Sequence, residues 1–203
     1  MVTSDPSLRS DQADLQRIPY DMVITLIGYR ASGKSSLAPM VAKKLGWSWI
    51  DSDREIERVA ERSIPEIFAA DGEAGFRELE SQILVDLLQR PQLVIASGGG
   101  SVLSADNRQV MKAAGPVVWL HVSAGILINR LNRDRKTGSV RPSLTGRPID
   151  EEVGEVLQQR EPLYRDAASL IIHTDGESRG TLARRIVNSL QDRIPTAHPG
   201  EPE

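Results

Sequence analysis

Residues 28–35, with the sequence GYRASGKS, match the pattern G-x-x-x-x-G-K-[ST] that binds nucleoside triphosphates. Glycines in such a loop let backbone N–H groups turn toward an anion, and the following helix directs its positive end to the same point. We expect Lys34 to reach the outer phosphates and the Ser35 hydroxyl to bind Mg²⁺. The guanine-reading pattern N-K-x-D is absent from the sequence, which favours ATP over GTP.

Two carboxylates, Asp51 and Asp53, stand together in the segment DSD. Alternation places both on one side if this segment is extended. Beside a bound Mg·ATP, one could hold the hydrated metal and the other could accept a hydrogen bond from a hydroxyl about to be phosphorylated. The alternative is structural, because Ser52 or Asp53 could cap the next helix.

Arginine and glycine clusters indicate a second, acidic ligand. Arg77 and Glu80 lie three residues apart on a predicted helix, so they form either a surface ion pair or an arginine held rigid for a carboxylate. The run Gly98-Gly99-Gly100 costs backbone entropy, which favours close approach of backbone N–H groups to a ligand over a plain turn. These features predict a small hydroxylated acid as acceptor.

A long polar segment, Asp134–Pro148, is rich in Arg, Gly and Pro, and we interpret it as a loop that forms a lid over the phosphates. The arginines in and just before it are Arg130, Arg133, Arg135, Arg141 and Arg147. Further along the chain, Pro162 lies between Arg160 and Arg165. A proline there is expected to disturb the helix, which indicates a role beyond packing.

Five short apolar runs alternate with helical patterns and must position these residues. The expected strands lie in 22–28, 47–51, 92–100, 116–122 and 169–175. The expected helices lie in 35–46, in short pieces around Pro65 within 52–72, and in 73–90, 107–115, 124–133, 149–167 and 178–191. This order predicts an α/β fold, a three-layer α/β/α arrangement with a central five-stranded parallel sheet. Ligands of such sheets bind beyond the carboxyl ends of the strands, where the phosphate loop, DSD and the glycine run all lie.

The composition limits the other possibilities. The chain has 203 residues, a net charge of −3 and no cysteine, which excludes disulfides and cysteine-ligated zinc and disfavours a nucleic-acid partner. No apolar run is long enough to span a bilayer and the start lacks a signal peptide, so we expect a cytoplasmic monomer without a membrane partner. We expect flexible tails at 1–20 and 192–203, and a single domain at 21–191 with its lid at about 133–148.

Taken together, the motifs resemble those of the shikimate kinases over about residues 22–190. They are GYRASGKSS, DSD, DGEAGFRELE, SGGGSV, VRPSL and REPLYR, in this order. The resemblance implies a P-loop, nucleoside monophosphate kinase-like fold. It also implies Mg²⁺-dependent transfer of the ATP γ-phosphate to the 3-hydroxyl of shikimate, a step of aromatic amino acid synthesis.

The resemblance also implies a role for individual residues. The catalytic residues would be Lys34, Asp53 and Arg141. The ATP site would comprise Gly28, Ala31, Ser32, Gly33, Lys34, Ser35, Ser36, Arg141 from the lid, and Arg130 over the adenine. The shikimate site would comprise Asp53, Arg77, Glu80, Gly98, Gly99, Gly100 and Arg160. The metal would be held by Ser35 and, through water, by Asp51.

Two departures and two alternatives accompany this interpretation. Ala31 stands where the family usually has glycine, so the loop either has an ordinary backbone conformation there or is strained. The lid segment is longer than we expect for the family.

Two alternative functions remain. A kinase of another hydroxy acid such as gluconate would have similar pocket chemistry, and acceptor screening separates it from a shikimate kinase. A non-catalytic ATP-binding module is opposed by the presence of each expected chemical residue.

Overall fold

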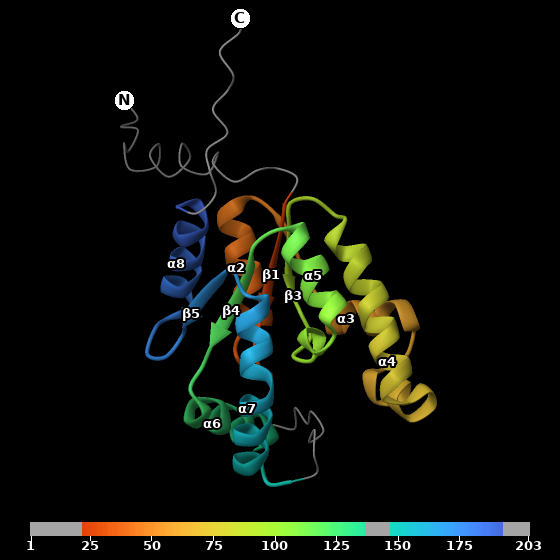
Figure 1. The fold of residues 1–203 in the computed structure, drawn as a ribbon. Helices are drawn as coiled ribbons and strands as arrows, with labels where there is room; N and C mark the ends of the chain where they lie inside the picture. Colours follow the sequence, from red (N-terminus) through yellow and green to blue (C-terminus); the bar gives the residue numbers. More distant parts are fainter. Residues whose placement is uncertain (1–21, 137–146, 193–203) are drawn as a thin grey trace, which may run out of the picture.

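Five parallel strands form the centre of the fold, in the order β2-β3-β1-β4-β5 (Figure 1). They are β1 (Val23–Ile27), β2 (Ser48–Asp51), β3 (Leu93–Ala96), β4 (Val117–His121) and β5 (Leu170–His173). The computed structural model describes residues 22–136 and 147–192, and it confirms the five predicted strands. Because β1 lies between β3 and β4, the phosphate loop leaves the sheet at its middle.

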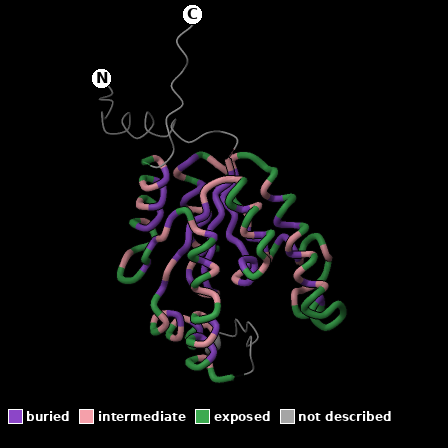
Figure 2. The backbone as a smooth tube through the Cα atoms, viewed as in Figure 1, coloured by how far each residue is buried: buried purple, intermediate pink, exposed green. Residues whose placement is uncertain are grey.

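Helices cover both faces of the sheet, which gives the predicted three layers (Figure 1). One face is covered by α2 (Lys34–Leu45) and α8 (Arg179–Gln191), and the other by α4 (Ile64–Leu88), α5 (Ala105–Ala114) and α7 (Ile149–Ala167). Along β1, Ile24 and Leu26 pack toward the first face, and Val23 and Ile27 toward the second. The strands β1, β3 and β4 are therefore buried on both sides, as Figure 2 shows, which explains their continuous apolar sequences, whereas the edge strand β2 is largely exposed.

The helical segment before the glycine run is divided as the sequence predicts. Helix α3 (Ser52–Ala60) ends before Pro65, and Ser63 begins α4 with a capping box to Glu66. Within α4, Gly72 has φ 71° and ψ −176°, which breaks the helix just before the predicted start at residue 73. The second piece of α4 carries Arg77 and Glu80 toward the carboxyl end of β3.

Two expectations for the later helices are wrong. Helix α6 (Ala124–Lys136) continues through the first three residues of the predicted lid loop. Helix α7 continues through Pro162 to Ala167, and the buried residues Val156 and Tyr164, before and after the proline, pack into the hydrophobic core. The short 3₁₀ helix η2 (Ser101–Leu103) directly follows the glycine run.

Several predictions fall on residues that the structure does not describe. They are the predicted tail 1–20, residues 193–203 of the second tail, and the middle of the lid with Arg141. Within residues 22–136 and 147–192, no helix combines the length and the apolar character needed to cross a membrane.

Candidate active site

The phosphate loop joins β1 to α2 and encloses the charge of Lys34. The Lys34 side chain is buried, and its Nζ donates hydrogen bonds to the carbonyl oxygens of Gly28 at 2.7 Å and Tyr29 at 2.9 Å. A weaker contact of 3.4 Å reaches Ser32 Oγ. The ammonium group therefore lies against the loop itself, at the amino end of α2, where a phosphate would meet it.

Ala31 adopts the left-handed backbone conformation, with φ 62°. Of the two possibilities that the sequence left open, the strained one is therefore present, at a cost of about 1 kcal/mol for a residue with a Cβ. Arg130 on α6 donates from Nη1 to the carbonyl oxygen of Ala31 at 3.0 Å. This contact holds the strained peptide and places Arg130 beside the predicted ATP site.

Asp51 caps helix α3, and this corrects two expectations. Its Oδ1 accepts hydrogen bonds from the backbone N–H groups of Asp53 at 3.1 Å and Arg54 at 3.4 Å, so the cap is neither Ser52 nor Asp53. Asp53 does not continue an extended segment, because the strand ends at Asp51 and Asp53 lies in the first helical turn. Ser52 has a different task, since its Oγ accepts the N–H of Gly98 at 2.8 Å.

A cavity of about 730 Å³ opens beyond the carboxyl ends of the strands. Its wall contains the predicted residues Ala31, Ser32, Gly33, Lys34, Ser35, Ser36, Asp51, Asp53, Gly99 and Arg130. The volume is within the range of small-molecule sites, which run from about 300 to 1,000 Å³. The phosphate loop and both aspartates therefore share one open space.

The cavity wall also contains residues that the sequence interpretation did not assign. They include Arg30, Glu177 and Arg179. The last two follow β5, and the rule that ligands bind beyond the carboxyl ends of parallel strands could have identified them. Gly28, Arg77, Glu80, Gly98, Gly100 and Arg160 are described residues that lie outside this wall.

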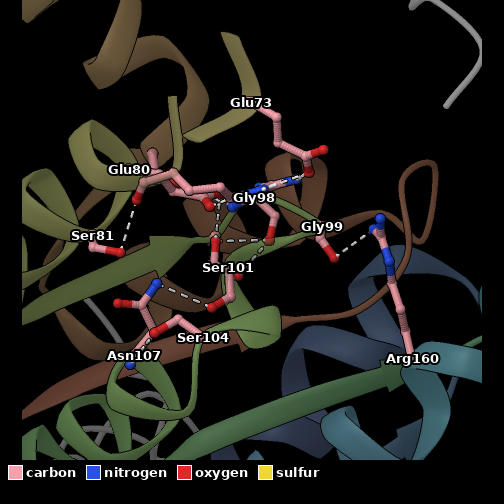
Figure 3. Close-up of polar contacts among 12 residues, drawn as sticks. Glu73, Glu80, Ser81, Gly98, Gly99, Ser101, Ser104, Asn107 and Arg160 are labelled. Atoms are coloured by element: carbon pink, nitrogen blue, oxygen red, sulfur yellow. Dashed lines mark hydrogen bonds and ion pairs between the residues drawn. The ribbon is translucent and has the colours of Figure 1, made fainter. Parts of the chain in front are cut away.

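Glu80 is the centre of a buried polar cluster beside the glycine run. Its side chain is 3% exposed, and Oε2 accepts a hydrogen bond from Arg77 Nη1 at 2.8 Å. Its Oε1 accepts from Ser101 Oγ at 3.1 Å, and Figure 3 shows Glu80 and Ser101 next to Gly98. A surface ion pair would not bury its carboxylate, so the structure favours Arg77 held rigid by Glu80. Ser101 was missed, although it directly follows the three glycines.

Gly98 and Gly100 leave room for side chains of the predicted acceptor site. A Cβ on Gly98 would lie 2.7 Å from Glu80 Oε1 and 2.8 Å from Asp53 Oδ1. A Cβ on Gly100 would lie 2.5 Å from Arg77 Nη1. The N–H of Gly98 is itself bonded to Ser52. Glycine is thus required at positions 98 and 100, because the predicted acceptor residues approach the Cα atoms there so closely.

Helix α7 contacts the same run from the other side. The carbonyl oxygen of Gly99 accepts hydrogen bonds from Arg160 Nη1 at 3.2 Å and from the Tyr164 hydroxyl at 2.7 Å (Figure 3 shows Arg160). Burial raises the pKa of Tyr164 to about 12, so the phenol stays protonated and donates at neutral pH. Arg165 points elsewhere, with its guanidinium 5.5 Å from the centre of the Trp119 ring.

The residues expected to hold a metal fit a hydrated Mg²⁺. Ser35 is exposed on the first turn of α2, and Asp51 lines the same cavity. The cap bonds go to Oδ1 of Asp51, so its other oxygen is available to a water molecule of the ion.

Comparisons with known proteins agree with this geometry. The family model described as shikimate kinase matches residues 30–191. A shikimate kinase of Rhodopirellula baltica is 41% identical over 169 residues, which cover 83% of this chain and 90% of that protein. One of Methylococcus capsulatus is 38% identical over 168 residues, which cover 83% and 92%.

A solved structure extends the likeness to the fold. The shikimate kinase of Acinetobacter baumannii in complex with shikimate superposes with a TM-score of 0.79 at 33% identity, over 91% of this chain and 99% of that chain. Its fold is the predicted P-loop, nucleoside monophosphate kinase-like one. On sequence and fold together, this chain belongs to the shikimate kinase family.

Proposed function

We propose that this protein transfers the γ-phosphate of ATP to the 3-hydroxyl of shikimate, giving shikimate 3-phosphate and ADP. One observation carries the proposal beyond the family likeness. Asp53 lines the cavity of the phosphate loop, and its Oδ1 also approaches Gly98 beside the buried Glu80 that holds Arg77. A phosphate donor and an acceptor with both a hydroxyl and a carboxylate would meet at Asp53.

Each group of site residues has its own role in the phosphoryl transfer. The acceptor oxygen forms a bond to the γ-phosphorus, the bond from that phosphorus to the bridging oxygen of ADP breaks, and the hydroxyl proton passes to Asp53. Lys34 stabilises the charge on the outer phosphates, and Arg77 and Arg160 bind the shikimate carboxylate. Ser35 and, through water, Asp51 would hold Mg²⁺, which would supply positive charge that neutralises the phosphates.

The remaining assignments are proposals that rest on the resemblance. Arg141 would reach the phosphates from the lid at about 133–148, and Arg130 would cover the adenine. The protein would act as a cytoplasmic monomer on two small molecules, without nucleic acid or membrane, and the tails 1–20 and 192–203 would be flexible.

The test is ADP release by the purified full chain with Mg·ATP and either shikimate, gluconate or no acceptor. We expect turnover with shikimate alone. Turnover with gluconate alone would support the same phosphoryl transfer with gluconate, rather than shikimate, as the acceptor. Clear ATP binding without turnover on either acid would indicate a non-catalytic module.

A further inference from the structure

A buried ion pair joins the phosphate loop to helix α7. Arg30, the third residue of the loop, contacts Oε1 of Glu152 through its Nη2. The exposed fraction is 10% for the Arg30 side chain and 0% for that of Glu152. The two residues are 122 positions apart in sequence, so only the tertiary fold brings them together.

Apolar side chains lie beside this pair, and Arg30 also lines the cavity of the phosphate loop. Tyr29, next to Arg30 in the loop, packs in one cluster with Val153 and Val156 of α7 and with Leu127 of α6. Apolar contacts of this kind tolerate small displacements, whereas a buried ion pair requires a defined geometry. The pair is therefore suited to set the position of α7 along the loop.

The same helix reaches the acceptor side of the site. Arg160 follows Glu152 by eight residues, about 12 Å along an α-helix, and donates to the carbonyl oxygen of Gly99. Tyr164, one turn further, donates to the same oxygen. Helix α7 thus contacts the phosphate loop at one end and the glycine run at the other.

We propose that Arg30 and Glu152 are a positioning pair through which the phosphate loop sets the place of α7, and thereby the place at which Arg160 meets the acceptor carboxylate. Although Arg30 belongs to the phosphate loop, this pair serves the acceptor. The inference rests on the proposed function, because it takes Arg160 to bind the carboxylate of shikimate.

The first test compares steady-state kinetics of the wild type and Glu152→Gln, which removes the charge with little change of shape. We expect KM for shikimate to rise about tenfold and KM for ATP to change by less than about threefold, because misplacing a binding group mainly weakens its own ligand. Glu161→Gln is the matched control. It removes an exposed ion pair with Arg165 on the same helix, and it should leave both KM values unchanged.

A second variant separates positioning from simple stability. Arg30→Met combined with Glu152→Leu replaces both charges by apolar side chains, which often restores the stability of a broken buried pair. We expect wild-type thermal unfolding but a KM for shikimate still raised about fivefold, since apolar packing does not fix the helix as sharply. This variant also provides the test if Glu152→Gln fails to fold.

Two results would overturn the proposal. Recovery of both stability and KM in the double variant would make the pair purely structural, and a larger effect on KM for ATP than for shikimate would assign it to the phosphate site. Failure of the proposed function can be distinguished from failure of this positioning proposal, because in the first case the wild type itself would not phosphorylate shikimate.

Discussion

The ATP side and the acceptor side of this site are held together by different interactions. On the ATP side, charged side chains are bound to backbone carbonyl oxygens, from Lys34 to Gly28 and Tyr29 and from Arg130 to Ala31. On the acceptor side, side chains also bind one another, since Arg77 of α4 and Ser101 of η2 both donate to the buried carboxylate of Glu80. Around the same glycine run, Asp53 Oδ1 approaches Gly98, and Arg160 and Tyr164 of α7 donate to the carbonyl oxygen of Gly99.

This difference bears on how each side is expected to fail. The loop is a local structure whose backbone bonds remain when one side chain is removed, so a change there should act on the chemical step. The acceptor side depends on the buried carboxylate of Glu80, and loss of a partner leaves that charge poorly compensated. Changes there should weaken the binding of the acceptor and disturb neighbouring residues as well.

The sharpest test of the ATP side is Lys34→Ala. Removing the charge on the outer phosphates should lower kcat by about 10³-fold or more, while the fold survives. Turnover with shikimate measures kcat, and thermal unfolding of the same preparation shows whether the fold survives. Activity close to that of the wild type would remove Lys34 from the proposed mechanism.

On the acceptor side, Arg77→Ala should raise KM for shikimate about 30-fold with a much smaller effect on KM for ATP, because it removes one of the two arginines proposed to bind the acceptor carboxylate. Arg58→Ala is the control, since Arg58 makes an ion pair with Glu55 of the same i,i+3 spacing outside the site. An equal effect of both variants, or an effect on ATP alone, would mean that the acceptor site is misplaced.

A smaller change on the same side is Gly100→Ala. The backbone of Gly100, at φ −101°, accepts a side chain, but the added Cβ would displace the guanidinium of Arg77. We expect KM for shikimate to rise about fivefold, as for a moderate misplacement of a binding group. Gly125→Ala on α6, where a Cβ meets no atom within 4 Å, should leave KM as it is. An unaltered KM in Gly100→Ala would show that Arg77 does not need its observed position.

The smallest expected effect returns to the ATP side. Ala31→Gly removes the cost of a left-handed alanine and should increase the free energy of unfolding by about 1 kcal/mol, measured in urea. We expect kcat to stay within about twofold, because the loop already has the conformation that glycine would adopt. A large fall in kcat would show instead that the strain itself contributes to catalysis.

Much of the architecture could be predicted from the sequence. The phosphate loop is contiguous, so its identity follows from local residue types and from the strand and helix on either side. The strands β1, β3 and β4 were recognised because burial on both faces requires unbroken apolar runs. The glycine at position 72 marked a helix boundary for an equally local reason, since its conformation is rare for other residues.

The tertiary structure decided the contacts between distant parts of the chain. Local patterns do not encode that Glu80 is shared by Arg77 and Ser101, or that Arg160 and Tyr164 donate to the carbonyl oxygen of Gly99. The ion pair of Arg30 with Glu152 was likewise invisible, because both residue types are ordinary in a loop and on a helix. Charged side chains are interpreted as exposed until packing encloses them, and which of them are enclosed depends on how the layers of the fold meet.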